Sequence, residues 1–99
     1  MPATVFQIPA HAMMKMYGAA PLATVRNLIR TDSYEMIGTF PTELTGEAAA
    51  EDMFDLSNNP SRDDQRAAVW GPHRSLSVGD VVFDGAESWL CLPMGWTKV

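Results

Sequence analysis

The 99-residue sequence has a single cysteine, Cys91, and no apolar stretch near the ~20 residues that a membrane-spanning helix needs. One cysteine cannot form an internal disulfide, which suits a reducing compartment. The N-terminal segment 1–14 has neither the basic start nor the continuous apolar run of a secretion signal. We therefore expect a cytoplasmic protein without a membrane segment.

Basic residues are scarce, because seven lysines and arginines stand against 12 aspartates and glutamates, a formal net charge of −5. Neutralisation of phosphates by lysine and arginine supplies most nucleic-acid affinity, so the sequence disfavours direct binding of DNA or RNA. The negative charge is concentrated in residues 43–64, where seven acidic side chains are opposed only by Arg62. This segment is the electrostatically distinct part of the chain.

The usual signatures of an enzyme, a metal site or a cofactor site are missing. No histidines or cysteines have the close spacing of a zinc site, and no glycine-rich loop is present to hold a phosphate. Cys91 would need His11 or His73 as a base to act as a nucleophile. It lies in the apolar segment 89–92, where burial would keep the thiol neutral. We therefore expect no catalytic residues, no metal and no cofactor.

The length suits one domain, residues 1–99, because a second core would be too small to be stable. Hydrophobic residues make up 46% of the sequence, enough for a packed interior. The local patterns follow the order β-α-β-α-β-β, which indicates an α+β fold. We expect a small antiparallel sheet with about two helices packed on one face.

Residue alternation and β-branched residues predict strands at 4–8, 34–40, 81–85 and 88–92. The last two would form a hairpin. Residues 96–99 would form a final strand or a docked tail. In the first strand Phe6 and Ile8 would face the core. In the second, alternation would place Tyr34, Met36 and Phe40 on one face.

Helical patterns are found in three places. Residues 10–17 are compatible with a helical turn that Gly18 stops. Pro21 can start a helix whose buried face carries Leu22, Val25, Leu28 and Ile29. A third helix would begin at Thr45, whose hydroxyl could accept a free amide of the first turn, and end before Ser57. The polar run 61–65 is a loop or a short helical turn.

Four segments carry a family resemblance: Phe-Gln-Ile at 6–8, Ser-Tyr-Glu-Met-Ile at 33–37, His-Arg-Ser-Leu-Ser-Val-Gly-Asp-Val-Val at 73–82, and Gly95-Trp96. Together they resemble the YodL-like domain family over essentially the whole chain. The resemblance implies a small domain of bacteria, phages and plasmids, often within mobile-element proteins, with no established activity. The sequence departs from the family at residues 91–94, directly before Gly95.

The segment 75–80 combines two hydroxyls, a glycine and a carboxylate, and we interpret it as structural. Ser75 or Ser77 would hydrogen-bond the nearby backbone, while Leu76 would fill the core. Gly79 would take a positive φ, and Asp80 would cap the turn into the next strand.

Two kinds of residue are candidates for binding a partner. Tryptophan anchors interfaces, and Trp70 and Trp96 lie near predicted loops, although a small domain also needs large side chains in its core. Carboxylates four residues apart on the third helix stand in a row roughly 6 Å apart, similar to phosphates along a nucleic-acid strand, although an ordinary amphipathic helix has the same pattern. The candidate partner-binding residues are Glu47, Glu51, Asp52, Asp55, Asp63, Asp64, Trp70 and Trp96.

We therefore interpret the chain as a non-enzymatic interaction module encoded by a mobile genetic element. Its acidic surface would bind a host protein, plausibly a basic nucleic-acid-handling complex, as anti-CRISPR inhibitors do. One alternative is an accessory or targeting domain that binds peptide or nucleic acid in mobile-element replication or regulation. It would use the hairpin surface and Arg26, Arg30, Arg66 and Arg74. Another is a small enzyme using Cys91 and His73. Nothing in the sequence specifies an oligomeric state.

Overall fold

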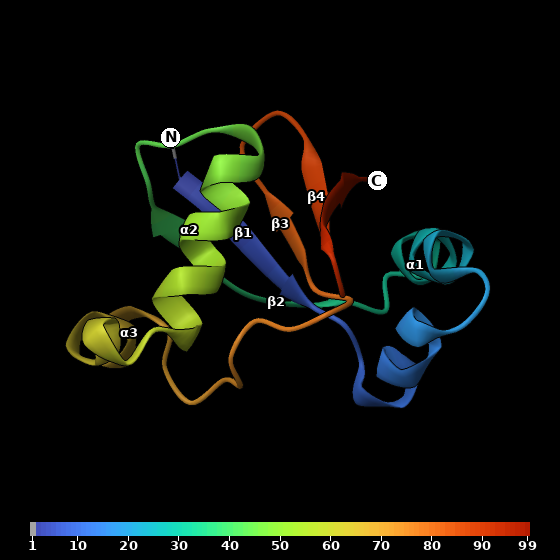
Figure 1. Cartoon of the computed structure of the whole chain (residues 1–99), viewed down its shortest axis with the longest axis horizontal. Helices are drawn as coiled ribbons and strands as arrows, with labels where there is room; N and C mark the ends of the chain where they lie inside the picture. Colours follow the sequence, from blue (N-terminus) through green and yellow to red (C-terminus); the bar gives the residue numbers. More distant parts are fainter. Residues whose placement is uncertain (1) are drawn as a thin grey trace.

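Five strands form one sheet in the order β2-β1-β3-β4-β5, with every neighbouring pair antiparallel (Figure 1). This arrangement comes from a computed structural model that describes residues 2–99. The strands are β1 (Pro2–Gln7), β2 (Glu35–Pro41), β3 (Val81–Phe83), β4 (Ser88–Leu92) and β5 (Gly95–Lys98). The helices are α1 (Pro21–Arg30), α2 (Gly46–Asn58), α3 (Asp63–Val69) and the 3-10 segments η1 (Ala10–Tyr17) and η2 (Pro60–Arg62). The predicted α+β class is confirmed.

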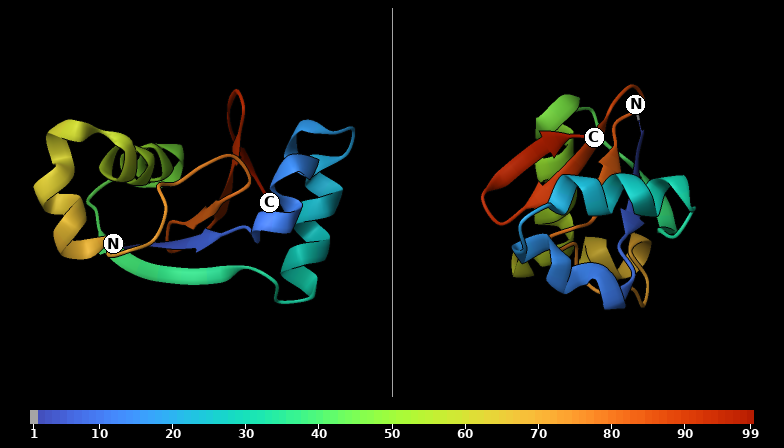
Figure 2. Two further views of the ribbon diagram at one scale, coloured as in Figure 1. Left: turned by 90° about the horizontal axis from the view of Figure 1, so that it is seen from below. Right: turned by 90° about the vertical axis from the view of Figure 1, so that its right-hand side faces the viewer.

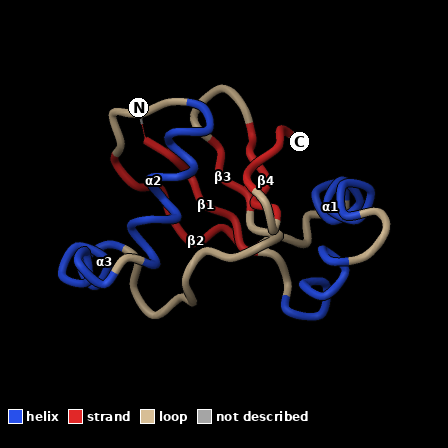
Figure 3. The backbone as a smooth tube through the Cα atoms, viewed as in Figure 1, coloured by secondary structure: helices blue, strands red, loops and turns tan. Residues whose placement is uncertain are grey.

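Helices cover both faces of the sheet, whereas the sequence suggested only one. Neighbouring residues of a strand point to opposite faces. Val5 and Val82 belong to a hydrophobic cluster with residues of α2, whereas Phe6 and Val81 belong to a second cluster with residues of η1 and α1. The strands accordingly run between the two helical groups, which lie at opposite ends of the long axis (Figures 2 and 3). The protein therefore has two separate apolar cores.

No helix within residues 2–99 has the length and apolar character needed to cross a membrane.

A β-bulge in β2 breaks the predicted alternation of that strand. Val5 is paired with Gly38 and Phe6 with Met36, so Ile37 is an extra residue between the two pairs. As a result Phe40 is buried while Met36 is 61% exposed, and the prediction that they share one face is wrong. On β1 the expectation for Phe6 and Ile8 agrees with the structure, because both contribute to the second core.

The helix boundaries agree with the sequence at α1 and differ near α2 and α3. α1 begins at Pro21, although Ile29 is 48% exposed instead of buried. Thr45 occupies the N-cap position of α2, but its hydroxyl makes no capping hydrogen bond within the described chain. The Asp84 carboxylate accepts the Gly46 amide instead, at 2.8 Å. The segment 61–65, expected as a loop or a short helical turn, is helical and belongs to η2 and to α3, which continues to Val69.

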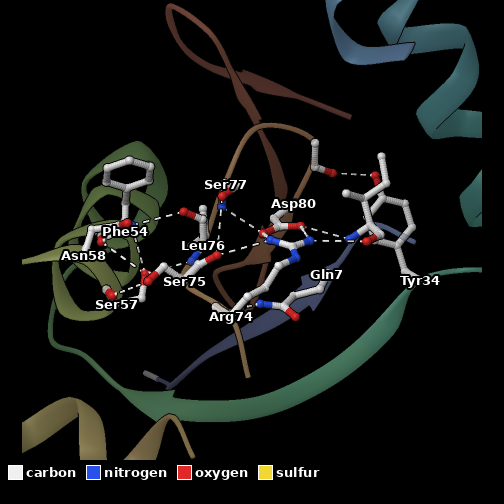
Figure 4. A network of polar contacts seen from close by, with 12 residues as sticks. Gln7, Tyr34, Phe54, Ser57, Asn58, Arg74, Ser75, Leu76, Ser77 and Asp80 are labelled. Atoms are coloured by element: carbon white, nitrogen blue, oxygen red, sulfur yellow. Dashed lines mark hydrogen bonds and ion pairs between the residues drawn. The ribbon is translucent and has the colours of Figure 1, made fainter. Parts of the chain in front are cut away.

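An ion pair between the partly exposed Arg74 and the buried Asp80 joins the N-terminal strand to the segment before β3 (Figure 4). Asp80 is fully buried, and both of its carboxylate oxygens accept from the Arg74 guanidinium at 2.7 Å. The same carboxylate accepts the Ile8 amide at 2.9 Å and the Ser77 amide at 2.8 Å. Arg74 also donates to the Ile8 carbonyl at 3.2 Å. The end of β1 is thereby fixed to the segment that precedes β3.

The turn at Gly79 requires a residue without a side chain. Its φ is +97°, and a Cβ there would lie 2.9 Å from side-chain atoms of both Ile8 and Met16. The Gly79 amide donates to the Cys91 carbonyl at 2.8 Å, and the Tyr34 hydroxyl donates to the Gly79 carbonyl at 2.7 Å. Gly79 and Asp80 therefore behave as the sequence interpretation of segment 75–80 expected.

Ser57, buried near the end of α2, connects that helix to the same segment (Figure 4). Its hydroxyl accepts the Leu76 amide at 3.0 Å, and its carbonyl accepts the Ser75 hydroxyl at 2.8 Å. The Asn58 side chain donates to the Leu76 carbonyl at 3.0 Å. Segment 74–80 thus contacts β1, β4 and α2 through directed hydrogen bonds.

Replacing Arg74 with methionine should be strongly destabilising, because it leaves a buried carboxylate without its counter-charge. We expect R74M to lower the free energy of unfolding by about 3 kcal/mol, measured by urea denaturation. R62M removes two ion pairs whose carboxylates, unlike that of Asp80, are partly exposed; it is the matched control and should cost about 1 kcal/mol or less. Equal losses in the two variants would contradict the central role of the Arg74–Asp80 pair.

A second buried carboxylate, Asp84, closes the β3–β4 hairpin and holds the start of α2. Oδ1 accepts the amides of Glu87 at 2.7 Å and Ala86 at 2.8 Å. Oδ2 accepts the Trp89 indole N–H at 3.1 Å in addition to the Gly46 amide. The amides of Glu87 and Ala86, followed by the indole and the Gly46 amide, lower the pKa of Asp84 to about 2.

Acid should therefore weaken the fold through Asp84. Because the pKa is lower in the folded state than the unfolded value near ~3.9, this stabilisation is complete above about pH 5 and is lost as the pH falls towards 2. We expect D84N to be less stable than the parent protein at pH 6 by roughly 1.5–3 kcal/mol, the range for hydrogen bonds to a charged group. The difference should shrink between pH 5 and pH 2 in chemical denaturation. A difference that stays constant over this range would refute the assignment.

Candidate interaction surface

The outward side of α2 carries the row of carboxylates that the sequence predicted. Glu47, Glu51 and Asp55 are exposed, while Ala50 and Met53 on the inward side are fully buried in the first core. The helix is therefore amphipathic with an acidic solvent face. We call the side chains of Glu47, Glu51 and Asp55, together with Trp96, the acidic surface.

Trp96 contacts this helix from β5. Its indole N–H donates to Glu51 Oε1 at 2.6 Å, and its ring is half-buried against the first core. Two residues that the sequence named separately thus lie together at the junction of α2 and β5. Their separation of 45 positions leaves no local signal for this contact. The result is a carboxylate next to a partly exposed aromatic ring.

Arginines neutralise the C-terminal half of the acidic segment. Arg62 pairs with Asp52 at 2.9 Å and with Asp55 at 3.0 Å, and Arg66 pairs with Asp63 at 2.6 Å. Hydrogen bonds from Arg62 and then Asn59 lower the pKa of Asp55, which is therefore committed to the ionised form. Glu47 and Glu51 keep uncompensated charge, since within residues 2–99 neither forms an ion pair.

Trp70 is not a surface residue, so its assignment as a partner anchor is wrong. Its side chain is 1% exposed and stacks on Phe40 with ring centroids 4.9 Å apart. Its indole N–H donates to the Arg74 carbonyl at 2.9 Å. The following Gly71-Pro72 suggested an exposed loop, but Trp70 stands directly at the end of α3 and closes the first core.

The arginines named for nucleic-acid or peptide binding do not gather in one place. Arg26 and Arg30 lie on α1, and Arg66 lies on α3 at the other end of the molecule (Figure 1). Arg74 is engaged with the buried Asp80. Among the described residues these four side chains therefore form no contiguous basic patch.

Two hollows open on the surface. One, of about 460 Å³, lies next to the acidic segment and is lined by Glu43, Asp52, Arg62, Gln65, Thr42, Pro2 and Pro41. The other, of about 180 Å³, lies on the opposite sheet face and is lined by Phe6, Ile29, Asp32, Tyr34, Val81 and Ser88. Local sequence patterns identify neither hollow, and the lining of the second comes from four separate segments. The one local signal was an aspartate where a helix end usually has glycine.

Within residues 2–99 no three histidine, cysteine or acidic side chains are grouped so that they could hold a metal ion. No family model, curated protein or solved structure matches this chain. The resemblance to the YodL-like domain family stays a prediction.

Cys91 has the environment of an inert core thiol. It is 5% exposed, and burial, followed by the negative charges of Asp80 and Glu51, raises the pKa of its thiol to about 12. A reactive cysteine needs the thiolate, which this environment disfavours. These features argue against Cys91 as the nucleophile of a small enzyme.

Cys91 should therefore resist alkylation in the folded protein. We expect iodoacetamide at pH 8 to modify it far more slowly than a free thiol, and modification to become rapid in 6 M guanidinium chloride, followed by intact-mass spectrometry. The reference for an exposed thiol is the variant C91A/M94C, which places the cysteine at position 94, where the side chain is 93% exposed. If native Cys91 reacts as fast as that reference, its assignment as a core residue is wrong.

Proposed function

We propose that this chain is a non-enzymatic interaction module that binds a basic protein partner through its acidic surface. The observation that carries the proposal is the contact between Glu51 and Trp96, which sets an exposed carboxylate beside an aromatic ring. Glu47 lies one helical turn away and extends the negative charge. The surface thus offers both charge and an aromatic contact to the same partner.

Lysine and arginine side chains are the groups that this arrangement recognises best. A carboxylate attracts their positive charge, and an indole ring next to it can contact the cation or its apolar stem. Charges at the rim of an interface mainly increase the rate of association and select against acidic partners. A basic protein whose natural ligand is a nucleic acid presents such side chains in a row, and the α2 carboxylates are spaced to meet them.

The biological setting belongs to the same proposal. The resemblance described above favours a mobile genetic element, and the acidic surface favours a host complex that handles nucleic acid as the target, as in anti-defence inhibition. The single, buried cysteine is compatible with the reducing cytoplasm. An accessory domain that binds nucleic acid through arginines is less well supported, because its four arginines are dispersed.

The proposal is tested by charge reversal on α2. The tagged protein, E47K/E51K and the control D32K/E35K are used to capture proteins from a bacterial lysate at 50, 150 and 300 mM salt, with quantification by mass spectrometry. All three proteins should fold, because the four positions are exposed. We expect captured nucleic-acid-binding proteins to fall about tenfold or more with E47K/E51K and with rising salt, since the interaction is electrostatic.

The control changes the net charge by the same amount at Asp32 after α1 and Glu35 on β2, which are not among the candidate partner-binding residues, so it separates a local contact from the overall charge. Added duplex DNA should release the same captured proteins, because the carboxylate row and the phosphates would occupy one groove. Capture that is unchanged in E47K/E51K, or lost equally in the control, would reject the acidic surface as the binding site.

A further inference from the structure

The smaller hollow lies on the sheet face opposite the acidic surface, beside the second core. Phe6, Val81 and Ser88 contribute from neighbouring strands β1, β3 and β4, and Ile29 and Asp32 from the end of α1. The rim carries further apolar side chains: pairing in the sheet places Met36 opposite Phe6 and Phe83 opposite Ser88. Ile29, Met36 and Phe83 are 48%, 61% and 36% exposed.

The wall of this pocket is held in place by the Asp80 network. Tyr34 lines the pocket, and its hydroxyl donates to the Gly79 carbonyl at 2.7 Å. Phe6 and Val81 belong to the second core, and Val81 directly follows Asp80 in the chain. The pocket therefore exists before any ligand arrives, which lowers the entropic cost of binding.

Asp32 occupies a position where glycine is usual and where a negative charge is unfavourable. It lies directly after the end of α1 with φ of +52°, the left-handed conformation that glycine adopts without strain. The Ser33 amide donates to the Leu28 carbonyl at 2.9 Å and the Asp32 amide to the Ile29 carbonyl at 3.1 Å, the hydrogen bonds of a Schellman motif. A negative charge is also repelled by the negative end of the helix dipole.

No compensating charge is supplied by the fold. Among residues 2–99 no lysine, arginine or histidine forms an ion pair with the Asp32 carboxylate. The carboxylate and the last carbonyls of α1 thus form a locally negative edge of a mainly apolar pocket. A ligand that matches this pattern has a cationic end and an apolar body.

We propose that this pocket binds a small primary amine with an aromatic or compact aliphatic group, the ammonium resting on Asp32. Its volume of about 180 Å³ suits one ring with a short chain, since an apolar cavity of about 150 Å³ holds benzene. A peptide segment would not fit. The apolar group contacts Phe6, Val81 and Ile29, and the ammonium pairs with the carboxylate at the end of α1. This site is independent of the acidic surface and of its partner.

The test uses 2-phenylethylamine as the probe and the full chain as the receptor, with binding followed by amide chemical shifts in ¹⁵N-labelled protein. Two compounds of the same shape serve as controls, the neutral 2-phenylethanol and the anionic 3-phenylpropionate. We expect the amine to shift the amides around Phe6, Ile29, Val81 and Ser88, and to bind at least about tenfold more tightly than either control.

D32N is the decisive variant because asparagine keeps the shape and tolerates the left-handed conformation. It should have a melting temperature equal to or above that of the parent, since a charge at the helix end is removed, and should lose the preference for the amine. E35Q, which removes a nearby carboxylate outside the pocket, should keep that preference, and I29A should weaken all three compounds. Equal affinity for amine and alcohol in the parent protein, or an unchanged preference in D32N, would overturn the proposal.

Discussion

The bidentate ion pair between Arg74 and Asp80 is the interaction on which the rest of the structure depends. Burying a carboxylate is costly unless all of its lone pairs are satisfied, and here a guanidinium and two backbone amides satisfy them. Because the two amides belong to residues 8 and 77, the pair can form only when the N-terminal strand and segment 74–80 are correctly placed. The ion pair therefore stabilises this topology of the sheet relative to alternatives that separate residue 8 from segment 74–80.

The same segment also links the two cores. Leu76 is buried in the first core and its backbone bonds Ser57 and Asn58 at the end of α2. Val78 packs on the second core, and Gly79 leaves no room there for a Cβ beside Ile8 and Met16. A sheet with helices on both faces has no single interior that could hold all its elements together. Segment 74–80 performs that role by passing from one face to the other.

Local sequence patterns predicted the features that depend on local chemistry. Pro21 started α1, and residues 81–92 formed the hairpin. The local patterns failed where a tertiary contact determines the direction of a side chain or the start of an element. The bulge that separates Met36 from Phe40 depends on pairing with β1, and the start of α2 is held by Asp84 from 38 residues away instead of by Thr45. Trp70 is buried in the first core, although the loop-forming residues Gly71 and Pro72 follow it directly. The contact of Glu51 with Trp96 was beyond any local pattern for the same reason.

The acidic residues behind the net charge of −5 lie in different environments. Asp80 and Asp84 are buried and hold the backbone through hydrogen bonds, so they contribute stability and little surface field. Asp52, Asp55 and Asp63 are each paired with an arginine at the α2–α3 junction. Glu87 pairs with Lys98, and Glu35 lies 3.9 Å from His73. The other five acidic residues form no ion pair among residues 2–99: Asp32, Glu43, Glu47, Glu51 and Asp64. Glu47 and Glu51 on α2, and Asp32 on the opposite sheet face, are among them, so their negative charge is available for contact with another molecule.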